Sequence, residues 1–405
     1  MLSYILLFFT AFPYVTFSIS PIGHGYVQPY CLITGMLVIF LNFRDVKYSA
    51  TRENLIILFS LVLGVVIFLS AIIFKDDVAK SIEAGFSLGY LAPFSFILLY
   101  LSYKIAINNI SKIGFRRIFV FSIFVYLTVG LIQVVHDPNF LVSYVGGGKT
   151  GLFGEVGEGR GTISLASEPS YYAFHMIALA TILSASTSIY LLLMSCLQVI
   201  FPAISFSGLI VLVMSMMIHF FSNAKLLKWG ILFIIIIIIF LRLAFVNMSS
   251  EWRALEMFDR LFSGDFLYFI LIDESASLRI INALMPFVYV INNYFLPMEM
   301  FDLTWSKYLS EFGMPWFKNL PENTRIMSGF GEVLVLYGAF VLPLIFKFSN
   351  NILWSLKRGG NNTTTFFGLC LFIMMFFTFS FSTPIVALAL VVFENLRNEQ
   401  YALNK

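Results

Sequence analysis

The chain has 405 residues, of which 59% are hydrophobic and only 12% are charged, and its formal net charge is +3. A soluble domain carries about 25% charged residues, so this composition excludes an ordinary soluble protein. The small positive charge does not indicate nucleic-acid binding, because the Lys and Arg residues lie in the connections between apolar runs. These runs of about 17–25 residues recur from end to end, which predicts an all-α, polytopic integral membrane protein.

In chain order, the apolar runs predict about twelve membrane spans, whose ends are defined to within several residues. They are residues 2–18, 28–43, 54–74, 82–102, 118–135, 169–185, 189–203, 208–221, 229–246, 326–347, 364–380 and 381–394. The seventh and eighth spans are short and flank the break at residues 205–208 (SFSG), so half-helices are an alternative interpretation for them.

The basic residues favour an orientation with both termini in the cytoplasm (N-in, C-in). In that orientation the short outer connections hold only Lys75, Lys80, Lys149 and Arg160. The cytoplasmic segments hold Arg44, Lys47, Arg52, Lys104, Lys112, Arg116, Arg117, Lys225, Lys228, Lys347, Lys357, Arg358, Arg397 and Lys405. Short cytoplasmic loops carry an excess of Lys and Arg in membrane proteins, which supports this assignment.

The predicted spans divide the chain into five regions. These are N-terminal spans (1–135), a Gly-rich outer loop (136–168), central spans (169–246), a large outer segment (247–325) and C-terminal spans (326–405). Within the outer segment, residues 250–262 have the pattern of an amphipathic helix, and residues 277–296 suit a helix lying on or dipping into the membrane. Both long connections lie on the outer side, so we expect any chemistry there.

The stretch 160–174 (RGTISLASEPSYYAF) leads from the Gly-rich loop into the sixth span. Glu168 and the proline after it mark the helix start, and Ser167 or Ser170 is expected to cap it. Arg160 offers a planar fork that suits phosphate oxygens. Glu168 is interpreted as a cap on the helix dipole, as a partner that orients Arg160, or as a base for an attacking hydroxyl. We interpret this junction as half of an active site.

We expect the other half in the large outer segment, where Arg279 heads an apolar run. Arg279 either binds phosphate or extends its side chain to the interface. Arg325 opens the tenth span on the same face. Arg253 and Arg260 are also candidates, although Glu256 is spaced for ordinary helix ion pairs with both. The segment holds ten acidic and six basic residues, which excludes a general basic patch, so individual arginines would bind an anionic substrate.

A few polar residues fall inside or near the predicted spans. His175 lies two helical turns beyond Glu168, and it either packs, lines a pore or contacts substrate. Glu332 is a functional candidate by default because it is a carboxylate inside a span, unless it pairs with Arg325. Glu394 is expected to extend towards the interface. No His, Cys and Asp group has the spacing of metal ligands, so we expect neither a metal nor a cofactor.

Several of these stretches resemble bacterial O-antigen and capsule repeat-unit polymerases of the Wzy type. The most specific is 160–171 (RGTISLASEPSY), which is similar to the sequence before a membrane helix in that family. The break at 205–208 resembles the family's Ser-x-x-Gly turn between paired short helices. Arg260, then 277–279 (SLR) and an apolar helix, resembles its large periplasmic segment, and 331–338 resembles the helix that follows. The similarity in layout covers most of the chain.

The resemblance implies a GT-C-like membrane fold and a metal-independent, inverting glycosyltransferase in the bacterial cytoplasmic (inner) membrane. Such an enzyme moves a growing glycan from undecaprenyl diphosphate to the non-reducing end of one lipid-linked repeat unit, on the periplasmic side. Arg160, Arg279 and Arg325 would then bind diphosphate and stabilise the leaving group, and Glu168 would orient Arg160 or deprotonate the acceptor. The remaining candidates for substrate contact are Arg253, Arg260, Tyr171 and His175.

The partners implied are the lipid bilayer, the lipid-linked donor and acceptor glycans, and a chain-length regulator protein, with no nucleic acid. Two departures concern the acceptor side. Related O-antigen ligases carry a His in the large outer segment, which this chain lacks there, so a glycan ligase is a less favoured alternative. The family's Pro-x-x-Gly-x-Gly after the outer apolar helix is replaced by residues 294–299 (YFLPME). A lipid-linked oligosaccharide flippase is the alternative from another class, although the two similar halves usual in transporters are not found.

Overall fold

The structure is a computed structural model, and it describes twelve ranges of residues along the chain. These ranges are 1–16, 27–44, 52–73, 91–145, 161–184, 186–222, 264, 274–298, 305–311, 326–354, 362–377 and 379–403. Across these ranges the regular structure is helical, apart from one isolated β-bridge between Val15 and Val145. The prediction of an all-α chain is therefore confirmed for the described residues.

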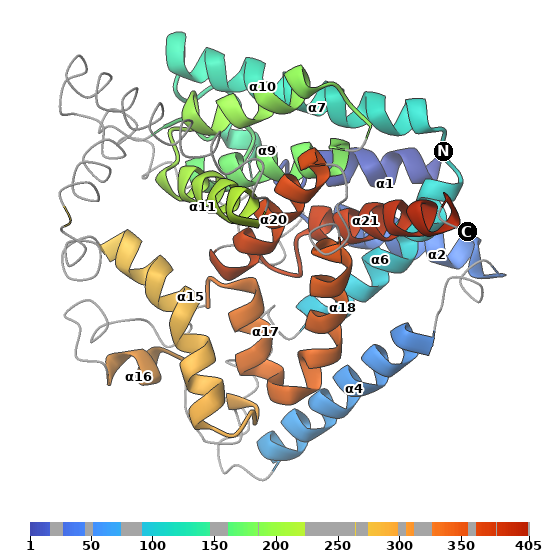
Figure 1. Cartoon of the computed structure of the whole chain (residues 1–405), viewed down its shortest axis with the longest axis vertical. Helices are drawn as coiled ribbons and strands as arrows, with labels where there is room; N and C mark the ends of the chain where they lie inside the picture. The colour runs from blue at the N-terminus through green and yellow to red at the C-terminus, as the bar shows by residue number, and fades with distance from the viewer. Residues whose placement is uncertain are drawn as a thin grey trace.

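The helices pack into one bundle (Figure 1). In chain order they are α1 (Leu2–Ala11), α2 (Tyr30–Leu41), α4 (Arg52–Ile73), α6 (Ala92–Asn108), α7 (Lys112–Val135), η2 (Val142–Tyr144), α9 (Pro169–Leu183), α10 (Ile189–Ile200), α11 (Phe206–Ser222), α15 (Glu274–Asn292), α16 (Trp305–Ser310), α17 (Gly329–Tyr337), η5 (Gly338–Val341), α18 (Leu342–Ile352), α20 (Asn362–Phe377) and α21 (Pro384–Leu403).

Each predicted span overlaps a described helix, except the ninth, 229–246, which lies outside the described residues. The predicted amphipathic helix at 250–262 also lies outside them, whereas the apolar run behind Arg279 forms α15. Two helical stretches, Lys112–Val135 and Gly329–Ile352, are long and apolar enough to cross a membrane. The number of spans and their orientation remain a proposal.

The second of these long stretches is not one regular helix. Gly338 has φ +56° and ends α17, and η5 then connects it to α18. A Cβ atom on Gly338 would lie 2.2 Å from the carbonyl oxygen of Phe295, while the N–H of Ala339 donates to that same carbonyl at 2.8 Å. Glycine is needed here because it adopts positive φ without strain and lets the chain behind α15 approach the backbone.

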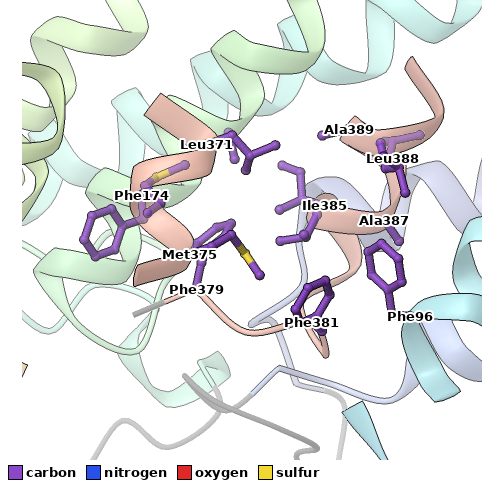
Figure 2. Close-up of a cluster of buried hydrophobic side chains, with 14 of the residues drawn as sticks. Phe96, Phe174, Leu371, Met375, Phe379, Phe381, Ile385, Ala387, Leu388 and Ala389 are labelled. Carbon is purple, nitrogen blue, oxygen red and sulfur yellow. The ribbon is translucent and has the colours of Figure 1, made fainter. Parts of the chain in front are cut away.

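Helix α9 lies at the centre of the bundle. It packs against α7, α10, α11, α20 and α21, and every residue from Tyr172 to Leu183 is buried. A helix that is apolar on all faces is expected to be surrounded by others. Figure 2 shows side chains of α6, α9, α20 and α21 converging around Ile385, with the small residues Ala387 and Ala389 on α21. The start of α9 is therefore held by a rigid core.

The bundle has two distinguishable ends, and α7 runs from one to the other. At its start, the Lys112 ammonium lies 3.5 Å from Glu399 near the end of α21. Beyond its last turn, Val145 forms the bridge with Val15, which follows α1. We call the first the termini end, because both chain termini lie there at the same edge of the molecule (Figure 1). We call the second the loop end.

Glu394 at the termini end corrects one expectation. It was predicted to extend to the interface, but it is buried. Its carboxylate forms an ion pair with the Lys104 ammonium at 3.1 Å and accepts a hydrogen bond from the Tyr100 hydroxyl. The prediction was wrong because these two groups of α6 satisfy the carboxylate inside the bundle, where a charge is retained only when it is paired and hydrogen-bonded.

Replacing Glu394 by alanine is therefore expected to lower the free energy of unfolding by about 3 kcal/mol, because it leaves the Lys104 ammonium unpaired and mostly buried. Thermal unfolding of the purified protein in detergent would measure the change. Glu399→Ala is the matched control on the same helix, since its ion pair with Lys112 is exposed and contributes little. Equal unfolding midpoints for the two variants would contradict the prediction.

Candidate functional site

Glu168 is the residue before the first turn of α9, and its backbone is extended (φ −150°, ψ 158°). Proline at position 169 begins the helix, and a residue before proline is disfavoured in the helical conformation, which places the N-cap at Glu168. The N-cap residue is therefore Glu168 and not Ser167 or Ser170, and the Glu168 side chain makes no capping hydrogen bond. Instead, the Ser170 hydroxyl donates to Glu168 Oε2 at 3.2 Å.

Arg279 of α15 reaches this helix start from more than 100 residues away in sequence. Its Nη1 donates to the Ser207 hydroxyl at 3.1 Å, and its Nη2 donates to the Ser170 hydroxyl at 3.3 Å. The same Nη2 lies 3.9 Å from Glu168 Oε2. One guanidinium thus joins the beginnings of α9 and α11 to α15. The two connections that we expected to share an active site meet at this point.

The electrostatics of this locus favour an anion. The starts of α9 and α11 each present about half a positive charge from the helix dipole, and Arg279 adds one more. Glu168 supplies the compensating negative charge within the group. The Arg279 side chain is 23% exposed, whereas that of Glu168 is 48% exposed. The Arg279 guanidinium is therefore held by hydroxyl groups in a poorly solvated position, while the Glu168 carboxylate remains accessible to a solute.

The approach of α9 to α11 depends on the segment before Glu168. The N–H of Thr162 donates to the Pro202 carbonyl at 3.0 Å, which lays residues 161–168 along the connection between α10 and α11. A Cβ atom on Gly161 would lie 1.8 Å from the carbonyl oxygen of Ala203, so only glycine permits this approach. Ser205 then caps α11 by accepting the Gly208 N–H at 3.2 Å.

Gln133, near the end of α7, anchors the same segment at its middle. Its side-chain amide donates to the carbonyls of Ser164 (3.1 Å) and Phe140 (2.9 Å), and its Oε1 accepts the Ser164 N–H at 2.7 Å. Ser164 has φ +51°, and its hydroxyl donates to the Tyr126 carbonyl at 2.7 Å. These bonds hold a non-helical segment against α7 and thereby set the position of Glu168.

Asn282 lies one helical turn after Arg279 on α15 and holds this helix in a similar way. Its buried Oδ1 accepts the indole N–H of Trp305 at 3.1 Å and the N–H of Met327 at 3.3 Å. Because Trp305 belongs to α16 and Met327 precedes α17, one amide ties both segments to α15. A residue with this role positions the arginine without contacting a substrate.

Asn282→Leu is expected to destabilise the protein by about 2 kcal/mol, because the apolar side chain leaves the Trp305 and Met327 N–H groups without their acceptor. Asn293→Ala, at the residue directly after the same helix, is the control, since the side-chain amide of Asn293 donates only to the Tyr289 carbonyl in the last turn of α15. Denaturation of both purified variants in detergent checks this difference. If Asn282→Leu unfolds at the same denaturant concentration as the control, the prediction that Asn282 positions Arg279 is contradicted.

The structure describes half of the eight residues predicted to form the site. Glu168 and Arg279 lie together, as given above, and their catalytic roles stay predictions. The residues outside the described ranges are Arg160, Arg253, Arg260 and Arg325. The tenth-span candidate Glu332 is buried and accepts the Ser380 hydroxyl at 2.9 Å.

Tyr171 and His175 lie on the first turns of α9. The Tyr171 ring is 6.1 Å from that of Tyr14. His175 is fully buried, its Nε2 lies 2.9 Å from the carbonyl oxygen of Ala11, and its ring packs against those of Tyr14 (5.7 Å) and Tyr126 (5.0 Å). These contacts correspond to the packing role among those considered for His175.

Ser170 and Ser207 are the site residues whose function the sequence did not reveal. Both are buried hydroxyls in the first turn of a helix, and both hydrogen-bond to Arg279. Ser170 was considered only as a cap, and Ser207 only as part of the SFSG break. The arginine at the head of an apolar run was the available signal that polar partners for it exist elsewhere in the chain.

Comparisons of this chain with protein-family models, with curated proteins and with solved structures found no match.

Proposed function

We propose that this protein is a glycosyltransferase that polymerises undecaprenyl-diphosphate-linked repeat units into a surface polysaccharide. The single observation that supports it most is the Arg279 guanidinium beside Glu168, at the starts of α9 and α11. A cation fixed among helix N-termini suits a diphosphate, and an accessible carboxylate next to it suits proton removal from a sugar hydroxyl. These are the two groups that transfer from a lipid diphosphate to an acceptor requires.

We include in the proposal about twelve membrane spans with both termini in the cytoplasm. Its support is that both termini lie at one end of the bundle (Figure 1). Arg279 lies beside Glu168, which follows a segment at the other end. The Gln133 bonds place residues 161–168 beside the last turn of α7, at the loop end. The candidate site then faces the periplasm, where lipid-linked glycans are exposed after translocation.

In the proposed reaction, a hydroxyl of the acceptor repeat unit attacks the anomeric carbon of the donor glycan. The bond from that carbon to the diphosphate oxygen breaks, and its electron pair leaves with undecaprenyl diphosphate. Arg279 binds the diphosphate and stabilises the negative charge that develops on the leaving oxygen. Glu168 takes the proton of the attacking hydroxyl. A single displacement of this kind inverts the configuration at the anomeric carbon.

The hydroxyl groups of Ser170 and Ser207 prepare the guanidinium for this task. They hold Nη2 and Nη1 respectively, so the plane of the fork is set before substrate binds. Pre-set donors are worth more in catalysis than donors that must reorganise. The Ser170 hydroxyl also donates to Glu168 Oε2, so the diphosphate-binding cation and the base belong to one hydrogen-bonded group.

The proposal is tested with a polysaccharide ladder from a strain that lacks the gene. Wild type should restore a ladder, and Glu168→Gln should leave glycan at one repeat unit, with a rate loss of about 100-fold or more for loss of a general base. Glu399→Gln, an exposed carboxylate at the termini end, is the control and should restore the ladder.

The phenotype of the gene-deficient strain separates the alternatives. Glycan that stops at a single unit on the outer face supports the polymerase. Long lipid-linked polymer that is never transferred onward would instead identify a ligase. Absence of any glycan on the outer face would indicate a flippase and would overturn the proposal.

A further inference from the structure

Three helices bring a group of charged side chains together at the termini end, away from the candidate site. Lys104 lies one turn before the end of α6, Lys347 lies on α18, and Glu394 and Arg397 lie one turn apart on α21. Glu394 is ten residues along α21 from Pro384, which corresponds to about 15 Å of helix. Lys347 and Glu394 are buried although both are ionisable. We call this group, with the side chains that contact it, the inner cluster.

The pairing inside the inner cluster is unequal. The Glu394 carboxylate accepts hydrogen bonds from both the Lys104 ammonium, at 3.1 Å, and the Tyr100 hydroxyl. Lys347 donates to the side-chain oxygen of Asn54, which is a neutral amide. Both ammonium groups lie over the Tyr100 ring, at 4.9 Å for Lys104 and 4.6 Å for Lys347. Two cations thus share one aromatic ring and one adjacent carboxylate.

The wider charge balance of the inner cluster is positive. Lys347 interacts electrostatically with the like charges of Lys104 and Arg397 and with the carboxylates of Glu394 and Glu53. Among the described residues, three cations therefore face two carboxylates, which leaves one positive charge beside the buried Lys347. Buried charges are normally paired, so this excess calls for an anion.

Two hydrogen-bond donors and one acceptor near these charges have no partner within the described part of the chain. They are the buried Nε of Arg397, the indole N–H of Trp354 and the side-chain oxygen of Asn351. Asn351 lies one turn after Lys347 on α18, Trp354 follows the end of that helix, and α18 packs against α21, which carries Arg397. Unpaired buried polar groups are rare and costly, which favours a polar partner beside these three atoms.

We propose that the inner cluster binds the phosphate of an anionic phospholipid headgroup. The phosphate oxygens accept from Arg397 Nε and from the Trp354 N–H and compensate the excess positive charge. A headgroup hydroxyl donates to Asn351 Oδ1, so a phosphoglycerol headgroup supplies both kinds of partner. Phe346, which precedes Lys347 and is 72% exposed, offers apolar surface beside the cluster for an acyl chain. Basic sites between helices bind anionic headgroups in this way.

The inference is independent of the proposed reaction, and its test measures binding alone. Purified full-length protein in detergent is titrated with phosphatidylglycerol or with phosphatidylcholine, while its thermal unfolding midpoint is followed. The wild-type midpoint should rise more with phosphatidylglycerol. Trp354→Phe keeps a ring but removes the N–H, and Arg397→Gln removes the charge, so each should weaken the apparent affinity at least about tenfold.

Arg117→Gln is the matched control, because Arg117 is exposed on the first turns of α7 at the same end. It should bind phosphatidylglycerol like wild type. Variants whose unfolding midpoint without lipid equals that of wild type are folded, so their apparent lipid affinities can be compared directly with that of wild type. Equal stabilisation by the two lipids, or unchanged affinity in Arg397→Gln, would overturn the proposal. If inorganic phosphate alone raises the unfolding midpoint as much as phosphatidylglycerol does, the ligand is free phosphate, and the lipid assignment is overturned.

Discussion

Arg279→Ala is expected to stop polysaccharide growth at a single repeat unit while leaving the protein folded in the membrane. The guanidinium contacts Ser170, Ser207 and Glu168, so its loss removes the cation that we propose binds the diphosphate. Removing one preorganised donor to a developing anion costs about 100-fold to 1,000-fold in rate. Arg279→Lys is expected to fail as well, because an ammonium cannot reach both serines with a planar fork. Incorporation of purified lipid-linked repeat units by membranes measures the rate.

The control for this prediction is Arg117→Ala, which removes an exposed arginine at the termini end. It should polymerise at the wild-type rate, and immunoblots should show equal amounts of all three variants in the membrane. A full ladder from Arg279→Ala at equal protein level would contradict the assignment of this arginine. It would leave the contact with Glu168 as a structural ion pair.

Gly161→Ala is expected to impair both stability and polymerisation, because its Cβ atom would lie 1.8 Å from the Ala203 carbonyl oxygen. That oxygen belongs to the backbone, and the neighbouring bond from Thr162 to Pro202, 3.0 Å long, prevents the two segments from separating freely. Overpacking of this kind costs about 1–3 kcal/mol. Displacing the segment also moves Ser170 relative to Ser207, so Arg279 loses its fixed orientation. We expect at least about a tenfold loss of rate together with a lower unfolding midpoint.

Gly35→Ala on α2 is the matched substitution. A Cβ atom there would meet Ser102 Oγ at 2.9 Å and Leu99 Cδ2 at 3.3 Å, which are side-chain atoms able to rotate away. Its unfolding midpoint should therefore change less than that of Gly161→Ala. If Gly161→Ala unfolds at the wild-type temperature and polymerises normally, the close approach of 161–168 to 201–205 is not required for function.

The sequence alone located the helices and two of the residues that meet at the candidate site. Apolar runs predicted the long described helices but not the short α16, since a run of suitable length must satisfy its backbone internally. The Glu-Pro pair predicted the start of α9, because proline favours the first turn of a helix. Arg279 was identified at the head of its apolar run. These features depend on neighbours within a few residues, which a linear sequence displays directly.

Only the tertiary structure decided which of these residues meet. The Arg279 guanidinium bonds to Ser207 and Ser170, which are 72 and 109 residues away, and no local pattern specifies such partners. Likewise, the sequence shows Glu394 only as a charged residue near a helix end. The structure shows that its carboxylate is paired with Lys104 and hydrogen-bonded to Tyr100, both on α6. Burial and pairing depend on how helices pack against each other. That packing rests on close approaches such as Gly161 to Ala203, whose significance appears only when both backbones are in place.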